Sequence, residues 1–215
     1  RRRPGRPSGV EWIVGPLKGH SPTSVAVAEG ADEAEDRYDL LTDAVKACIS
    51  LDSPRTCAVV TSGGRRYFAA EIAAILIRSG VPSHVFVDRG EPRTFERLHS
   101  TSPDLLVVLS DGLAEAELPP SIELCITFRR SQKMVSFPQL DVYVVDELGF
   151  LGHSTDCETF ALYNDVCYFE TSDNGNLVVT ALYNRVRPMV RVETLDRVDA
   201  LGTHTLTFAA LSPIE

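Results

Sequence analysis

The sequence predicts an α/β fold in which a parallel-sheet βαβ core is followed by a smaller β-rich region. From Cys57 to Val145, short apolar runs alternate with segments of helical periodicity, which is typical of a parallel sheet with right-handed crossovers. After about Gly149 the helical pattern stops, and strand-like runs are separated by Asp-Asn-Gly and Arg-Pro turns. We predict three parts: a disordered basic tail over 1–9, an α/β sheet domain over 10–149, and a β-rich subdomain over 150–215 packed on it.

Two short strands and one long helix are expected at the start of the chain. The apolar runs Val10–Val14 and Ser24–Ala28 are interpreted as strands, with a loop rich in Gly and Pro between them. From Asp32 onward, Tyr38, Leu41, Val45 and Cys48 recur at intervals of three and four residues. This spacing predicts an amphipathic helix, and the acidic residues around Asp32 suit its first turns.

Strands and helices then alternate along the chain. The continuous apolar runs are typical of strands that are buried on both faces, and Gly80 and Pro82 favour the end of a helix. The expected elements, in order, are a strand over 57–61, a helix over 68–79, a strand over 84–87, a helix over 92–100, and strands over 105–109, 124–128 and 142–145. In the second half, strands are expected over 160–169, 176–181, 189–192 and 203–208.

Composition limits the classes of function. The 215 residues carry a net charge of −9, which argues against broad nucleic-acid binding, although the first residues are rich in arginine. No apolar run reaches the length of a membrane-spanning helix, so no membrane partner is expected. The five cysteines lack Cys-x-x-Cys spacing, which predicts a reduced, cytoplasmic chain. Arginine outnumbers lysine 18 to 3, a composition that favours a GC-rich bacterial source and a role in secondary metabolism.

Four segments in the second half follow one another in a characteristic order. They are Tyr143-Val-Val-Asp-Glu147, Asp156-Cys157-Glu158, Gly175-Asn-Leu-Val-Val-Thr180 and Pro188-Met-Val-Arg191-Val-Glu-Thr-Leu-Asp196. This order resembles the phenylacetate–CoA ligase branch of the adenylate-forming enzymes. Members carry Tyr-Gly-x-Ser-Glu, a Glu-Cys pair ten residues after that Glu, then Gly-x-Leu-Val-x-Thr and Pro-x-Ile-Arg-Tyr-x-Thr-x-Asp. Glu147 and Cys157 keep the ten-residue interval, and Arg191 and Asp196 keep theirs.

The resemblance implies a chemistry and a role for each matched residue. In the family a carboxylate attacks the α-phosphate of ATP, giving an acyl-adenylate and pyrophosphate. By position, the resemblance implies that Glu147 corresponds to the catalytic glutamate on the metal side of the family's site. Tyr143 corresponds to the tyrosine that stacks near adenine, and Asp196 to the aspartate that binds the ribose hydroxyls. Arg191 takes the arginine of the last motif. Independently, Glu147 follows an apolar strand, and ligands of open α/β sheets bind at the carboxyl ends of such strands.

Several departures from the family pattern argue against full ligase turnover. The place of the phosphate-binding loop reads Gly15-Pro-Leu-Lys-Gly-His-Ser-Pro-Thr23, which lacks the hydroxyl-rich core. Two arginines, Arg129 and Arg130, replace the small residues that lie against adenine in the family. No lysine follows Lys133, and the sequence ends 19 residues after Asp196, so the lid domain and its catalytic lysine are expected to be missing.

The leading hypothesis is therefore a degenerate ligase-like protein that binds, with or without transforming, a small acidic or aryl-acyl molecule. Arg129 and Arg130 are candidate ligand-binding residues because paired guanidinium groups clamp carboxylates, or they neutralise Asp146 and Glu147. No cofactor is expected. One alternative is an active adenylate-forming enzyme that uses ATP and Mg²⁺ with a rebuilt site or a separate lid protein. Another is a non-catalytic partner subunit, and a homo-oligomer is compatible with each of these.

A metal site was also considered. His153, Cys157 and Cys167 supply three ligands of the kind that zinc prefers, but their spacing is irregular and a fourth ligand is not evident. Buried structural cysteines are the favoured interpretation, and no metal site is predicted.

Overall fold

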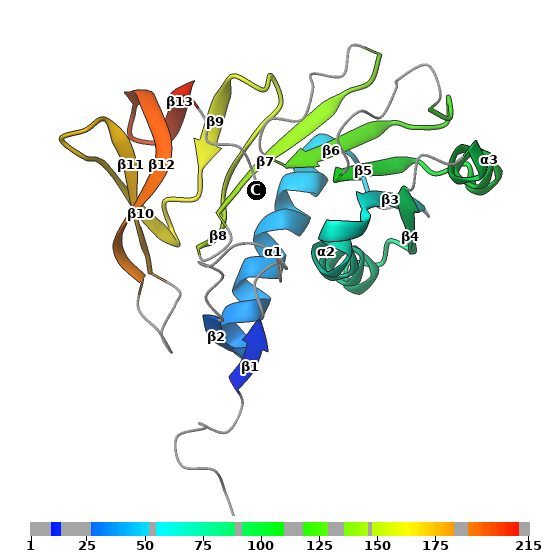
Figure 1. Ribbon diagram of the computed structural model, residues 1–215, viewed down its shortest axis with the longest axis horizontal. Helices are drawn as coiled ribbons and strands as arrows, with labels where there is room; N and C mark the ends of the chain where they lie inside the picture. Colours follow the sequence, from blue (N-terminus) through cyan, green and yellow to red (C-terminus); the bar gives the residue numbers. More distant parts are fainter. Residues whose placement is uncertain are drawn as a thin grey trace, which may run out of the picture.

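The computed structural model describes residues 10–13, 27–51, 55–88, 92–109, 118–128, 136–145, 148–182 and 189–210, with side chains from Tyr38 onward. Its main feature is a mixed sheet of 11 strands in the order β10-β11-β12-β13-β9-β8-β7-β6-β5-β3-β4. Figure 1 shows α2 and α3 on the side of β3 and β4 and α1 beside β7 and β8, and among the described residues no helix follows α3 along the chain. The predicted α/β fold is confirmed.

The first half of the sheet is parallel. Its strands are β3 (Cys57–Ser62), β4 (Ser83–Asp88), β5 (Leu105–Leu109), β6 (Leu124–Phe128) and β7 (Gln139–Val145). Neighbours pair in parallel from β4 through β3, β5 and β6 to β7. All five residues of β5 and of β6 are buried, as expected for strands covered on both faces.

Helices cover both faces of this parallel half. They are α1 (Ala31–Cys48), α2 (Arg66–Arg78), which follows a short 3₁₀ turn over Gly63–Arg65, and α3 (Pro92–Thr101). Val59 on β3 packs in one core with residues of α1 and α2, whereas Val60 packs in a second core with Leu98 of α3. Since successive side chains of a strand point to opposite faces, the two cores lie on opposite sides of the sheet.

The second half is antiparallel. Its strands are β8 (Gly149–Ser154), β9 (Thr159–Leu162), β10 (Cys167–Thr171), β11 (Asn176–Ala181), β12 (Met189–Leu201) and β13 (Thr205–Ala210). A third core lies under these strands and includes Phe160, Leu177 and Leu206. A separate two-stranded sheet joins β1 (Val10–Ile13) to β2 (Val27–Gly30) near the start of the chain.

Strand β7 connects the two halves. It pairs in parallel with β6 on one side and antiparallel with β8 on the other. Val142 and Val144 point into the core beneath α1 and α2, whereas Tyr143 points into the core of the β-rich half. The sheet therefore runs on without a break past Gly149, and the division there into two domains stays a prediction.

Most expected elements are present within a few residues of their predicted bounds, and three features differ from the expectation. The single strand predicted over 160–169 is two strands, because a turn at 163–166 separates β9 from β10. Strand β8 was not predicted, because Gly149, Gly152 and His153 interrupt its apolar pattern. Strand β12 extends to Leu201, well beyond the predicted end at Val192. No helix in the described parts of the chain is long and apolar enough to cross a membrane.

Candidate functional site

The structure brings Tyr143 and Asp196 into direct contact. Tyr143 lies on β7 and Asp196 on β12, and the phenol hydroxyl donates a hydrogen bond to Oδ2 of Asp196 at 2.7 Å. Both residues are 0% exposed. A buried carboxylate requires hydrogen-bond donors, and Tyr143 provides one of them. The two residues matched to adenine and ribose contacts thus bind each other.

Aromatic side chains surround this pair. The ring of Tyr143 lies with its centroid 4.9 Å from that of Phe208 and 5.9 Å from that of Phe160, and the latter two rings are 5.6 Å apart. These separations are typical of favourable edge-to-face and tilted packing. Beyond their positions in strands, no role was predicted for Phe160 and Phe208. The available signal was the alternation of apolar and polar residues in β9 and β13, because it places both phenylalanines on the inward face.

Strand β8 is the neighbour of β7 in the sheet and lies beside Tyr143. Gly152 is the partner of Tyr143 across the β7–β8 ladder, next to an irregularity in register. A Cβ atom at Gly152 would lie 2.5 Å from the carbonyl oxygen of Ala161 on β9, closer than such atoms approach. Only glycine therefore allows β8 and β9 to approach this closely beside Tyr143.

Arg191 is not part of this cluster. Its guanidinium group is 62% exposed and makes an ion pair with Glu170 of β10 at 2.5 Å. Its backbone has a φ of 51°, and its N–H donates to Oγ1 of Thr180 at 3.0 Å. This left-handed conformation lies where the β11–β12 register is irregular. The structure thus places Arg191 on the solvent side of β12, while Asp196 on the same strand is buried.

The remaining candidates, Glu147, Arg129 and Arg130, lie outside the described residues, as does Asp146. Their neighbours along the chain are described: Phe128 ends β6, Val145 ends β7, and Leu148 is fully buried. The roles of the three candidates stay predictions.

A second buried polar group near this site was missed. Asp141 of β7 accepts a hydrogen bond from the hydroxyl of Thr127 at 2.7 Å, and Gln139 donates to that hydroxyl at 2.9 Å. Asp141 is two residues from Tyr143 and therefore lies on the same face of β7. The sequence signal was weak, because an acidic residue inside a strand is far more often exposed.

The three residues considered for zinc are not gathered. Nδ1 of His153 is 3.0 Å from the hydroxyl of Tyr163, Cys157 lies in the turn after β8, and Cys167 is buried on β10. Burial lowers the pKa of His153 and raises the pKa of Cys167 to about 12. Among the described residues, no group of three His, Cys, Asp or Glu side chains is placed to hold a metal ion.

Asp156 organises the turn between β8 and β9. Its Oδ1 accepts hydrogen bonds from the backbone N–H groups of Thr159 and Glu158, each at 2.8 Å, and from the Ser154 hydroxyl at 2.7 Å. These bonds, with that of Thr159 foremost, lower the pKa of Asp156 from its ordinary 3.8 to about 2. The turn is therefore most stable when Asp156 is ionised.

We expect Asp156→Asn to remove one component of the acid sensitivity of this protein. A carboxyl group whose pKa is lower in the folded state stabilises that state above its unfolded pKa and ceases to do so as pH falls. The contribution of Asp156 should thus fade between about pH 3.8 and about pH 2. Asparagine keeps the acceptor oxygen but not the charge. Thermal melts across this interval should show that the melting temperature of the wild type falls toward that of the variant. A difference in melting temperature that stays constant with pH would contradict the prediction.

Comparisons with known proteins add to this geometry. No protein-family model matches the sequence, and no curated protein matches it. Solved structures do match, and the fold is similar to that of 2-hydroxyisobutyryl-CoA ligase and of VinN. The open form of 2-hydroxyisobutyryl-CoA ligase with 2-HIB-AMP and CoA gives a TM-score of 0.67 at 14% identity, over 84% of this chain and 51% of that one.

Two further structures show the same likeness. VinN with L-aspartate gives a TM-score of 0.61 at 12% identity, over 94% of this chain and 59% of VinN. The R395G form of coronafacic acid ligase from Pectobacterium brasiliense gives 0.56 at 13% identity, over 88% and 45%. The present chain thus spans about half the length of the structures it matches. At these identities the likeness concerns the fold alone.

Proposed function

We propose that this chain is a degenerate relative of the phenylacetate–CoA ligase branch that binds a small acidic or aryl-acyl molecule and does not complete an ATP-dependent ligation. One observation carries the proposal. The two side chains matched to nucleotide contacts, Tyr143 and Asp196, are fully buried and hydrogen-bonded to each other at 2.7 Å. Neither presents a surface to a nucleotide in this arrangement.

Nucleotide binding would require this pair to separate. A ribose that bound Asp196 would replace the hydrogen bond from Tyr143, and an adenine beside Tyr143 would displace the ring of Phe208 or Phe160. Each exchange replaces a contact already made inside the protein with a contact to the nucleotide. The net free energy of nucleotide binding should therefore be small. The altered phosphate-binding segment, Gly15–Thr23, supplies no compensating hydroxyl cluster.

The class of ligand is supported by the fold and by the candidate cations. The matched structures include a ligase with an acyl-AMP and CoA, VinN with L-aspartate, and a ligase named for coronafacic acid. A small carboxylate or its acyl derivative is therefore the ligand class that we infer. Arg129 and Arg130 follow β6, and we propose that they bind its carboxylate, with Glu147 after β7 as the acidic group nearest the reacting end.

A non-catalytic partner subunit is the second candidate. It is favoured by the way apolar side chains fill the region between β6 and β8. Phe150 is only 1% exposed, and its ring lies 6.3 Å from that of Phe128, which in turn contacts Phe68 of α2 at 5.2 Å. If this packing leaves no space for a ligand, the surface of the chain would carry its function.

Calorimetry separates these possibilities. We expect no heat of binding for ATP or AMP with Mg²⁺ at millimolar nucleotide, and saturable binding for at least one aromatic acid from a panel such as benzoate, phenylacetate and cinnamate. Micromolar affinity for ATP or AMP would overturn the proposal and favour an active adenylate-forming enzyme. Absence of binding for nucleotides and acids alike would favour the partner subunit.

The double variant Arg129→Ala, Arg130→Ala tests the role of the two arginines. Under the proposal it keeps the melting temperature of the wild type and loses affinity for the aromatic acid. A variant that unfolds several degrees early, with unchanged acid binding, would show that the arginines are structural.

A further inference from the structure

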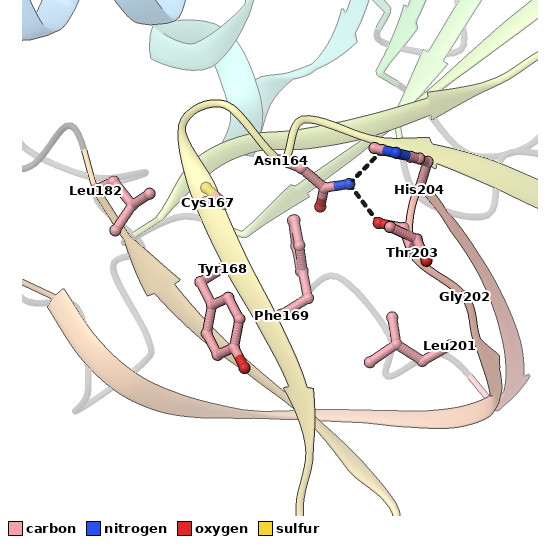
Figure 2. Close-up of a pocket in the computed structure, with 9 residues that line it drawn as sticks. All are labelled: Asn164, Cys167, Tyr168, Phe169, Leu182, Leu201, Gly202, Thr203 and His204. Carbon is pink, nitrogen blue, oxygen red and sulfur yellow. Dashed lines mark hydrogen bonds between the residues drawn. The ribbon is translucent and has the colours of Figure 1, made fainter.

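A pocket lies between strand β10 and the turn that joins β12 to β13, away from the Tyr143–Asp196 pair. Its volume is about 600 Å³, within the ordinary range of small-molecule sites. Figure 2 shows Asn164, from the turn between β9 and β10, reaching across to Thr203 and His204. Phe169 of β10 and Leu201 at the end of β12 line the same space.

The orientation of the Asn164 side chain follows from its partners. The carbonyl oxygen of Thr203, which can only accept a hydrogen bond, lies 2.5 Å from Nδ2. The amide nitrogen must therefore face Thr203, and the same nitrogen lies 2.8 Å from Nδ1 of His204. Both N–H groups are thus used within the protein. Among the described residues Oδ1 has no partner, and Figure 2 shows it on the side of Phe169.

The same bond fixes the tautomer of His204. Because Nδ2 of Asn164 is a donor only, Nδ1 of His204 must accept, and the ring proton of neutral His204 lies on Nε2. The imidazole is thereby held as one wall of the pocket. The Asn164–His204 contact joins residues 40 positions apart, from the turn before β10 to the turn before β13.

The lining of the pocket combines the apolar side chains of Phe169 and Leu201 with the polar side chains of Asn164 and His204. No Asp, Glu, Lys or Arg is among the described residues that line it. The thiol of Cys167 stays protonated near neutral pH, since burial raises its pKa to about 12. A phosphate or carboxylate would find no counter-charge here, whereas an uncharged ring would contact Phe169 and Leu201.

We propose that this pocket binds a small uncharged aromatic molecule that bears an N–H donor, of the class of primary aryl carboxamides. The N–H group donates to Oδ1 of Asn164, and the ring packs against Phe169 and Leu201. The site differs in place and in chemistry from the one proposed for an acidic ligand, so each can fail without the other.

The test compares three small aromatic probes. Benzamide offers an N–H donor without charge, N,N-dimethylbenzamide lacks the donor, and benzoate carries a charge. Amide chemical shifts of the full chain should follow saturable benzamide binding, with a dissociation constant on the order of 1 mM for so small a ligand. The shifts should map to 164–169 and 201–204. The other two probes should bind about tenfold more weakly, because each lacks an N–H group to donate to Asn164.

A pocket-filling variant makes the result specific. Thr203 is exposed and contributes its backbone carbonyl to the Asn164 bond, so Thr203→Trp should occupy the pocket without removing that bond. We expect it to weaken benzamide binding at least about tenfold. The matched control is Val190→Trp, since Val190 is 63% exposed and lies outside the pocket, and it should bind as the wild type does. Equal binding of the three probes, shifts located elsewhere, or no effect of Thr203→Trp would overturn the proposal.

Discussion

Replacing Tyr143 by phenylalanine is expected to lower the free energy of unfolding by about 1–3 kcal/mol, the range for removing one hydrogen-bond partner of a buried polar group. The substitution removes one oxygen and keeps the ring, so the packing against Phe160 and Phe208 is preserved. What changes is that Oδ2 of Asp196, fully buried on β12, loses the Tyr143 hydroxyl as a hydrogen-bond donor at 2.7 Å. Urea unfolding monitored by circular dichroism would measure the loss.

The control is Tyr168→Phe. Tyr168 lies on β10 with 59% of its surface exposed, so losing its hydroxyl should change stability by no more than about 0.5 kcal/mol. A double-mutant cycle of Tyr143→Phe with Asp196→Ala then isolates the contact, and the two effects should not add. Additive effects, or a Tyr143→Phe protein as stable as the wild type, would show that Asp196 is satisfied without Tyr143. Tyr143 and Asp196 would then not be a structural pair at the positions matched to nucleotide contacts.

The second large effect is expected for Gly152→Ala. The new Cβ would lie 2.5 Å from the carbonyl oxygen of Ala161, and since that atom belongs to the backbone of β9, strand must move against strand. Overpacking of this kind costs about 1–3 kcal/mol, and more where the backbone must shift. Because Gly152 is the ladder partner of Tyr143, the strain should also reach the Tyr143–Asp196 contact. Chemical denaturation would report the first effect, and amide hydrogen exchange on β7 and β8 the second.

Gly64→Ala provides the comparison. A Cβ at Gly64 would have no neighbour within 4 Å, so this substitution should leave stability nearly unchanged. If Gly152→Ala is as stable as Gly64→Ala, strands β8 and β9 are packed less closely than described. The region beside Tyr143 would then have space for an added side chain.

The parallel half of the fold was predictable from sequence because its signals are local. Leu105–Leu109 and Leu124–Phe128 are continuous apolar runs, and only strands buried on both faces need such runs. Helix α2 was predictable from its apolar periodicity and from Gly80, which follows it. The φ of Gly80 is 86°, a conformation that favours glycine after a helix. In each case the residues that determine the element lie within it.

The β-rich half was less predictable because long-range contacts determine it. The strands β9 and β10 form one apolar stretch in sequence, and only the packing of Asn164 against the β12–β13 turn shows why the chain bends between them. Strand β8 lacks a clear alternating pattern, since Gly152 is required by its distance to β9 and not by any local preference.

By itself, the sequence determined the α/β class, the order of the elements in the parallel half and, through the spacing of its motifs, that Tyr143 and Asp196 belong to one region. Only the tertiary structure decided what that region is. Residues 53 positions apart meet although β8, β9 and β13 separate β7 from β12 in the order of the sheet, and the buried carboxyl group of Asp196 accepts a hydrogen bond from the phenol hydroxyl. A motif fixes which side chains are available, whereas burial and distance decide whether they face a ligand or one another.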